Sequence, residues 1–187
     1  MATEVTADAA IVLPAEQAGN ITVSYVEGGP GSIVNLTTAS SDATVALTGP
    51  VTLTGERASG FQFTFAQAAE LTVENTLSKS TIIAAEGNDS VGFVAGSNQK
   101  NTVVKLADGA DSVNYGGAIK GGAKVRMGAD SSADVVEVGS LKDIKTTKGL
   151  VVREFGTEDT LIVNGKTYTT DNVGKADFKD KIIVKFD

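Results

Sequence analysis

Apolar and polar positions alternate along much of this chain, and around a recurring aspartate the alternation keeps a fixed register. Five aspartates recur every 21 to 25 residues: Asp89, Asp111, Asp134, Asp159 and Asp180. One apolar residue stands seven positions before each of these aspartates. Two more apolar residues stand two and four positions after it. Side chains two positions apart lie on one face of a strand. The pattern therefore predicts a strand after each aspartate, with its apolar face buried.

The repeat also predicts which apolar residues stack in the core. Seven positions before the aspartates stand Ile82, Val104, Met127, Val152 and Val173. Two positions after them stand Val91, Val113, Val136, Leu161 and Ile182, and four positions after them Phe93, Tyr115, Val138, Val163 and Val184. Units of this length are typical of solenoids, in which equivalent residues stack about 4.8 Å apart.

The fold class that we predict is all-β. It is a right-handed parallel β-solenoid-like repeat preceded by an N-terminal β region. The alternative is an antiparallel β-sandwich in which each unit forms a hairpin. Linkers of variable length at residues 95–100, 116–122 and 139–149 favour the solenoid, because insertions can loop outward without disturbing the stack. We expect residues 1–66 to form an N-terminal arm and antiparallel strands, and residues 67–187 to form about five repeat units.

Strand signals are also present before the repeat. Residues 21–25 alternate strictly between apolar and polar side chains, and Phe61, Phe63 and Phe65 place three aromatic rings on one face of a predicted core strand. The run Gly28-Gly29-Pro30-Gly31 predicts a turn. Residues 1–20 are interpreted as an extended arm or a first edge strand.

Composition narrows the range of functions. The 187 residues contain no histidine and no cysteine, and the formal net charge is −7. Ser-His-Asp catalysis and thiolate or imidazole zinc sites are therefore excluded. The acids are spread along the chain and no basic cluster is evident in the sequence, which argues against nucleic acid as a partner. No apolar run is long enough for membrane insertion, and the first residues lack the features of a signal peptide.

The aspartates admit two interpretations. An aspartate before a strand can accept hydrogen bonds from nearby backbone amides and close the turn. Alternatively, Glu86 with Asp89 and Asp108 with Asp111 place pairs of carboxylates three residues apart around a glycine, which suits Ca²⁺. The segments 87–91 (GNDSV) and 109–113 (GADSV) resemble hemolysin-type calcium repeats. That resemblance implies a structural calcium ion held by these four residues, and no other cofactor is expected.

Two acidic pairs are candidates for catalytic carboxylates. Asp130 with Asp134 and Glu158 with Asp159 could supply the acid and base of a glycoside hydrolase. Their position in polar turns favours solvated turn residues instead. We therefore predict no catalytic residues and no enzymatic activity.

The remaining profile is that of a Gly-, Thr- and Val-rich acidic β protein with a repeat. It is similar to small structural proteins of bacterial virus particles, such as capsid decoration proteins, knobs and fibre segments. This resemblance implies a homo-oligomer that docks on a capsid or filament protein, in a virion or extracellular location and without a signal peptide. The alternative is a secreted calcium-binding repeat protein, either an adhesin or a surface-layer component.

Overall fold

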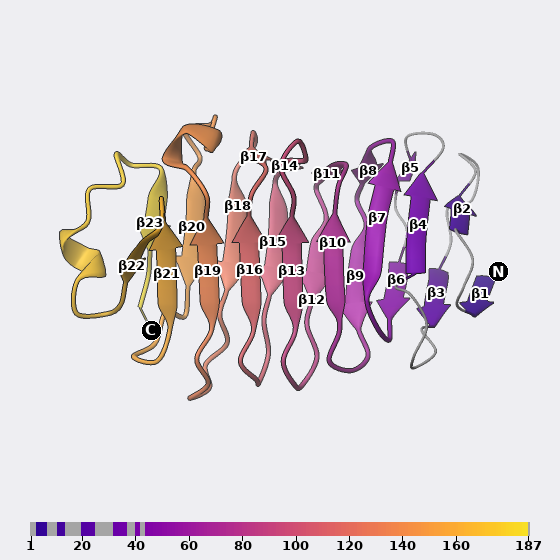
Figure 1. Ribbon diagram of the computed structural model, residues 1–187, viewed down its shortest axis with the longest axis horizontal. Helices are drawn as coiled ribbons and strands as arrows, with labels where there is room; N and C mark the ends of the chain where they lie inside the picture. Colours follow the sequence, from indigo (N-terminus) through magenta and orange to yellow (C-terminus); the bar gives the residue numbers. More distant parts are fainter. Residues whose placement is uncertain are drawn as a thin grey trace.

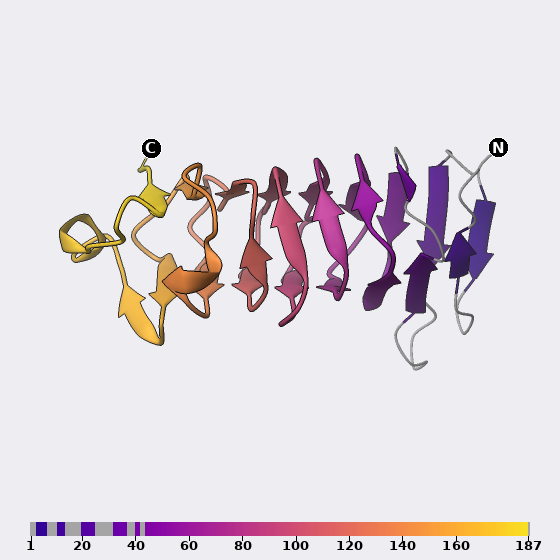
Figure 2. The same cartoon turned by 90° about the horizontal axis from the view of Figure 1, so that it is seen from above.

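The computed structural model describes residues 3–6, 11–13, 20–24, 32–36, 40–41 and 44–186, and it describes side chains at residues 33–34 and 44–186. The described chain is a β-solenoid with three faces, sheets A, B and C (Figure 1). Its turns follow one another in a single row, with the N-terminal strands at one end and a loop-rich segment at the other (Figure 2). The predicted solenoid is confirmed, and the alternative antiparallel sandwich is not formed.

In spatial order, sheet A contains β1 (Thr3–Thr6), β3 (Asn20–Ser24), β6 (Thr44–Leu47), β9 (Gln62–Phe65), β12 (Thr81–Ile83), β15 (Thr102–Lys105), β18 (Ala123–Arg126), β20 (Leu150–Arg153) and β23 (Ile182–Val184). Sheet B contains β2 (Ile11–Leu13), β4 (Ser32–Leu36), β7 (Val51–Gly55), β10 (Glu70–Val73), β13 (Ser90–Phe93), β16 (Ser112–Tyr115), β19 (Val135–Val138), β21 (Thr160–Val163) and β22 (Lys166–Tyr168). Sheet C contains β17 (Ala118–Ile119), β14 (Asn98–Lys100), β11 (Thr76–Ser78), β8 (Ala58–Ser59) and β5 (Ser40–Ser41). Two short 3₁₀ helices, η1 (Leu141–Asp143) and η2 (Val173–Lys175), lie in the C-terminal part.

The winding of the chain can be followed in Figure 1. The chain ascends through sheet B in front, crosses sheet C at the top and descends through sheet A behind, while it advances from right to left. A chain that rises in front and falls behind as it moves to the left winds right-handed. Strands of neighbouring turns pair in parallel throughout the described chain, except for β22, which folds back antiparallel on β21.

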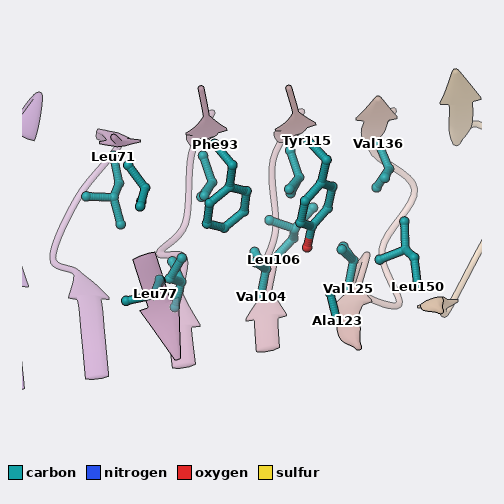
Figure 3. Packing of buried hydrophobic residues seen from close by; sticks show 14 of the residues in the cluster. Leu71, Leu77, Phe93, Val104, Leu106, Tyr115, Ala123, Val125, Val136 and Leu150 are labelled. Carbon is teal, nitrogen blue, oxygen red and sulfur yellow. The ribbon is translucent and has the colours of Figure 1, made fainter. Parts of the chain in front are cut away.

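The interior is a continuous apolar stack. Strand side chains alternate between buried and outward positions, as in β13 and β16. The rings of Phe93 and Tyr115 stack in adjacent turns with their centroids 4.9 Å apart, and both point into the interior (Figure 3). The three phenylalanines of the predicted core strand, Phe61, Phe63 and Phe65, are all buried. Such stacked rings contribute beyond the apolar area that they remove from water.

The predicted register holds in sheet B and fails in part in sheet A. Val91, Val113, Val136 and Leu161 pair in sequence, as do Phe93, Tyr115, Val138 and Val163. In sheet A the stacked residues are Ile82, Val104, Val125, Val152 and Val184. Met127 is buried but lies beyond β18, because residues 127–134 connect β18 to β19 whereas shorter segments, such as 106–111, connect the other strand pairs.

The fifth predicted unit is not a fifth copy of the others. Val173 is buried in η2 rather than in sheet A, and Asp180 is exposed with a left-handed φ of 57°. Ile182 and Val184 belong to β23, which pairs with β20 of sheet A. After β21 the chain folds back as β22, the last strand of sheet B. The alternating apolar residues after Asp180 therefore belong to a strand of sheet A.

The N-terminal region also differs from expectation. Its described strands are not antiparallel: β1 with β3, β3 with β6 and β4 with β7 all pair in parallel. They belong to the same sheets as the repeat, and β9 pairs directly with β12 across residues 66 and 67. The predicted arm at residues 1–20 and the turn at residues 28–31 lie largely or wholly outside the described residues.

Two of the three predicted outward linkers are parts of the solenoid wall. Residues 98–100 form β14 and residues 118–119 form β17, so the segments 95–100 and 116–122 contribute to sheet C. The third linker, 139–149, contains η1, and its Ile144 bridges to Ile119. These strands are short and partly polar, so no apolar alternation marked them in the sequence.

Candidate functional site: the buried aspartate column

Four strands of sheet B begin directly after a buried aspartate. Asp89, Asp111, Asp134 and Asp159 precede β13, β16, β19 and β21, and their exposed fractions lie between 0 and 4%. The first residues of these strands pair from turn to turn, so the aspartates that precede them stack as well. We call these four residues the aspartate column. They are the four predicted aspartates that the structure brings together, and Asp180 is not among them.

One carboxylate oxygen of each aspartate binds the preceding turn. The backbone N–H of Ala69 donates to Oδ1 of Asp89 at 2.7 Å, and the N–H of Asp89 donates to Oδ1 of Asp111 at 2.7 Å. The series continues from Asp111 to Asp134 at 2.9 Å and from Asp134 to Asp159 at 3.1 Å. Ala69 holds the equivalent position one turn earlier. The column therefore links five successive turns through side-chain-to-backbone hydrogen bonds.

The second carboxylate oxygen closes the local turn in three of the four cases. Oδ2 of Asp89 accepts from the N–H of Ala85 at 2.8 Å, and Oδ2 of Asp111 accepts from the N–H of Ala107 at 3.3 Å. Oδ2 of Asp159 accepts from the N–H of Gly156 at 2.7 Å. Aspartate suits this position because its short side chain reaches backbone amides on both sides.

Asp134 is the exception. Its Oδ2 is buried and has no hydrogen-bond partner within the described chain. The connecting segment before it, residues 127–134, differs in length from its neighbours, so no amide stands where Ala107 or Gly156 stands in other turns. The pKa of Asp134 is raised to about 7. Burial is the largest cause, the negative charges of Asp111 and Asp159 also raise the pKa, and the hydrogen bond from the Asp111 amide lowers it in part.

The other members of the column have raised pKa values for the same reason. Burial raises the pKa of Asp111 to about 6, although hydrogen bonds from the amides of Asp89 and Ala107 oppose the change. Burial also raises the pKa values of Asp89 and Asp159 above the usual range. A stack of buried carboxylates that repel one another favours proton uptake near neutral pH. Chemically, the column can tie turns together and exchange protons.

The four residues predicted to hold calcium occupy two different environments. Asp89 and Asp111 are buried in the column, with their oxygens engaged by backbone amides, whereas Glu86 and Asp108 are exposed. Across the described ranges, no group of three or more acidic side chains is arranged to hold a metal ion. The geometry of Asp89 and Asp111 is that of the turn-closing interpretation, and calcium binding stays a prediction.

In each of the two acidic pairs considered as catalytic groups, one carboxylate is buried and the other is more exposed to solvent. Asp134 and Asp159 are buried, whereas Glu158 is exposed and Asp130 is half-buried. Asp130 accepts hydrogen bonds from the amides of Gly109 and Ser132, both at 3.0 Å. These bonds outweigh its slight desolvation and lower the pKa of Asp130 below the usual range.

Sequence reasoning missed one arrangement of charged residues. Lys105, Arg126 and Arg153 are far apart in the chain, but they pair directly across three neighbouring strands of sheet A. The expectation that the chain has no basic cluster is therefore wrong. The signal was present in the sequence as a basic residue directly after a core valine, in Val104-Lys105, Val125-Arg126, Val152-Arg153 and Val184-Lys185.

Comparisons with protein-family models, with curated proteins and with solved structures found no match for this chain. Within the ranges described, no helix has the length and hydrophobicity needed to span a membrane.

Proposed function

We propose that this chain is a non-enzymatic structural protein of an extracellular assembly, acting by self-association and by docking on a capsid or filament protein. A bacterial virus particle is the assembly that its composition resembles. The calcium-binding adhesin or surface-layer protein has no comparable geometric support at Glu86 and Asp108, which are exposed and isolated from a third acidic ligand within the described chain.

The observation that carries the proposal is the pair of edge strands at one end of the stack. Within the described chain, β1 pairs only with β3 and β2 pairs only with β4. Each therefore presents one row of backbone N–H and C=O groups to a further strand. Such edges are templates for pairing with another chain unless they are covered. The end strands of a second copy of this chain could pair with β1 and β2 at the spacing that separates neighbouring turns.

The opposite end of the stack carries exposed apolar side chains. Ile183 in β23 and Phe186 just beyond it are 45% and 51% exposed. Phe186 also lies against Phe155, with an edge-to-face ring arrangement and a centroid distance of 6.1 Å. Apolar groups gathered at the last strand of sheet A suit a contact that removes them from water. Both ends of the described stack thus carry edge strands, and the end at β23 adds exposed apolar side chains.

Light scattering of the full chain over a range of concentrations tests the proposal. We expect oligomers whose fraction rises with concentration, and filaments or closed particles in electron micrographs. Ile183→Lys should reduce association, because a lysine on an edge strand opposes strand pairing. Val94→Lys is the matched control, since Val94 is 36% exposed in the middle of the stack. A strictly monomeric chain with no affinity for any shell or filament would overturn the proposal.

A further inference from the structure

The outer face of sheet A carries a row of basic side chains in register. Lys105 at the end of β15 pairs with Arg126 of β18, and Arg126 pairs with Arg153 of β20. Lys105 and Arg126 are exposed and Arg153 is half-buried. Adjacent strands lie about 4.8 Å apart, so the backbone positions of these residues follow that spacing along the axis of the solenoid.

Lys185 extends the row by one turn. Val184 pairs with Val152, and the N–H of Lys185 donates to the carbonyl oxygen of Val152 at 2.9 Å. The carbonyl oxygen of Lys185 in turn accepts from the N–H of Phe155 at 3.3 Å. These two bonds place Lys185 beside Arg153, and its side chain is exposed. We call Lys105, Arg126, Arg153 and Lys185 the basic ladder.

The charges of the basic ladder are not neutralised by other side chains of the described chain. No ion pair or side-chain hydrogen bond involves any of its four members in the part of the chain that the structure describes. Like charges directly opposite one another on neighbouring strands destabilise a sheet. The row nevertheless runs through four successive turns of a chain with a net charge of −7. An external anion would relieve this repulsion.

The surroundings of the ladder are mainly aliphatic. The neighbouring outward column of sheet A contains Val103, Lys124, Val151 and Ile183. Lys124 adds a further exposed positive charge, and it lines a shallow hollow of about 300 Å³ with Val103 and Val151. Glu154, directly after Arg153, is the acidic residue next to the ladder in sequence, and it makes no ion pair within the described ranges.

We infer that the basic ladder binds a linear acidic polysaccharide laid along the axis of the solenoid, with several of its carboxylates facing the ladder. In a polyuronate every sugar ring carries one carboxylate, so a chain laid along the axis brings negative charges past basic side chains that follow one another about every 4.8 Å. The guanidinium groups of Arg126 and Arg153 can each bind one carboxylate through two parallel hydrogen bonds. Val103 and Val151 give the sugar rings an apolar surface beside the charges.

The same features disfavour nucleic acid and anionic lipid. Double-stranded DNA carries a charge about every 1.7 Å of its axis, a much denser row than the ladder. Single strands bind through stacking of bases on aromatic side chains, and the outward columns of sheet A from β15 to β20 contain none. A lipid surface would call for a broad basic patch, whereas β15, β18 and β20 carry one basic residue outside the ladder, Lys124.

Binding of the full chain to immobilised polygalacturonate tests the inference. The fully methyl-esterified polymer is the matched control, because it keeps the sugar backbone and has no charge. We expect saturable binding to the acid form, none to the ester, and a marked loss at salt concentrations that shorten the screening length to about 3 Å. Single-stranded DNA and phosphatidylserine vesicles are tested in parallel, and equal or tighter binding to either would overturn the choice of polysaccharide.

Two triple variants of equal charge change locate the site. Lys105→Gln/Arg126→Gln/Arg153→Gln should weaken binding by at least about tenfold, because charge-assisted hydrogen bonds are lost. Lys142→Gln/Lys166→Gln/Lys175→Gln alters three exposed lysines away from sheet A that do not lie in one row, and it should leave affinity within about twofold. If the triple variant folds poorly, the single variant Arg126→Gln is measured instead, because Arg126 is exposed. It should also weaken binding to polygalacturonate.

Three results would contradict the inference. They are the absence of saturable binding to polygalacturonate, equal binding to its methyl ester, and equal weakening by the two triple variants. Self-association is measured separately, by light scattering of the chain without polysaccharide and by the Ile183→Lys variant, which leaves all four members of the basic ladder unchanged. Failure of the polysaccharide inference and failure of the proposed structural role are therefore distinguishable.

Discussion

The backbone N–H of Asp111 donates to Oδ1 of Asp134 at 2.9 Å, although the two residues lie one full turn apart in the solenoid. The same carboxylate leaves its other oxygen buried without a partner in the described chain. Asp134 is thus both a link between turns and a weak point of the column. Neutralising its charge and removing its acceptor should have opposite effects on stability.

Asp134→Asn and Asp134→Ala separate these two roles. Asparagine keeps an oxygen acceptor for the Asp111 amide and removes a charge that burial disfavours. We therefore expect Asp134→Asn to stabilise the protein at pH 8, by an amount on the order of 1 kcal/mol. Alanine leaves the Asp111 amide without its acceptor and should cost about 1–3 kcal/mol at pH 5, where the charge matters least. Urea unfolding at both pH values measures the differences, and equal effects of the two variants would contradict the assignment.

The aspartate column predicts how stability changes with pH. Burial raises the pKa values of Asp111 to about 6 and of Asp134 to about 7, from 3.8 for a free aspartate. The folded chain therefore holds protons that the unfolded chain has already released. This contribution to stability is complete below about pH 4 and is lost as the pH rises through 6 and 7. We expect the free energy of unfolding to fall from pH 5 to pH 8, and the fall to be smaller in Asp134→Asn.

Stacked glycines impose a second local constraint. Gly109 has a φ of 135°, and a Cβ there would collide with the carbonyl oxygen of Gly87 in the preceding turn. Gly109→Ala should destabilise the protein by about 2 kcal/mol or more through this collision and backbone strain. Gly92→Ala is the control, because its Cβ would meet nothing within 4 Å. Thermal unfolding should show a clear loss for the first variant and almost none for the second.

Calcium gives a test of the resemblance to hemolysin-type repeats. The oxygens of Asp89 and Asp111 already accept amide hydrogen bonds, and Glu86 and Asp108 are exposed. We expect the melting temperature to be the same in excess Ca²⁺ and in a chelator, because a ligand stabilises only the state that it binds. A rise in melting temperature with Ca²⁺ that Asp108→Asn abolishes would instead support the alternative function.

The basic ladder predicts an effect on stability that does not depend on any ligand. Arg126 has a like charge on each side, Lys105 and Arg153. Arg126→Gln should therefore stabilise the isolated protein by about 0.2–1 kcal/mol, more at low salt than at high salt. The control is Lys175→Gln, because Lys175 is an exposed lysine of η2 and takes no part in strand pairing. A loss of stability in Arg126→Gln would show that its side chain makes a favourable contact.

Much of the solenoid could be predicted because alternation and a fixed repeat length report burial directly. The Phe61–Phe65 strand and the Val91 and Phe93 columns followed from that alternation. The repeat pattern does not identify the N-terminal turns, because Ala69 rather than an aspartate occupies the equivalent position in the turn before Asp89. Parallel pairing of the backbone does not require a carboxylate. The N-terminal strands therefore join the same sheets without an aspartate in front of them.

The errors near the other end have a different origin. Apolar alternation after Asp180 is the same whether the strand joins sheet A or sheet B, so the sequence could not reveal that β23 pairs with β20. The shift from Met127 to Val125 arises from the length of the segment 127–134. The basic ladder was overlooked because its members are distant in sequence, and only the register of sheet A aligns them.

The carboxyl group of Asp134 and the Asp111 amide that it accepts should respond to pH together if the aspartate column links the turns as described. Carbon-13 NMR of the Asp134 carboxyl group, with the Asp111 amide proton followed in the same samples, measures both between pH 3 and pH 9. We predict a midpoint at about 7 for Asp134 and a change in the Asp111 amide shift with the same midpoint. A midpoint near the free value of 3.8, with no matching response of the Asp111 amide, would contradict the account.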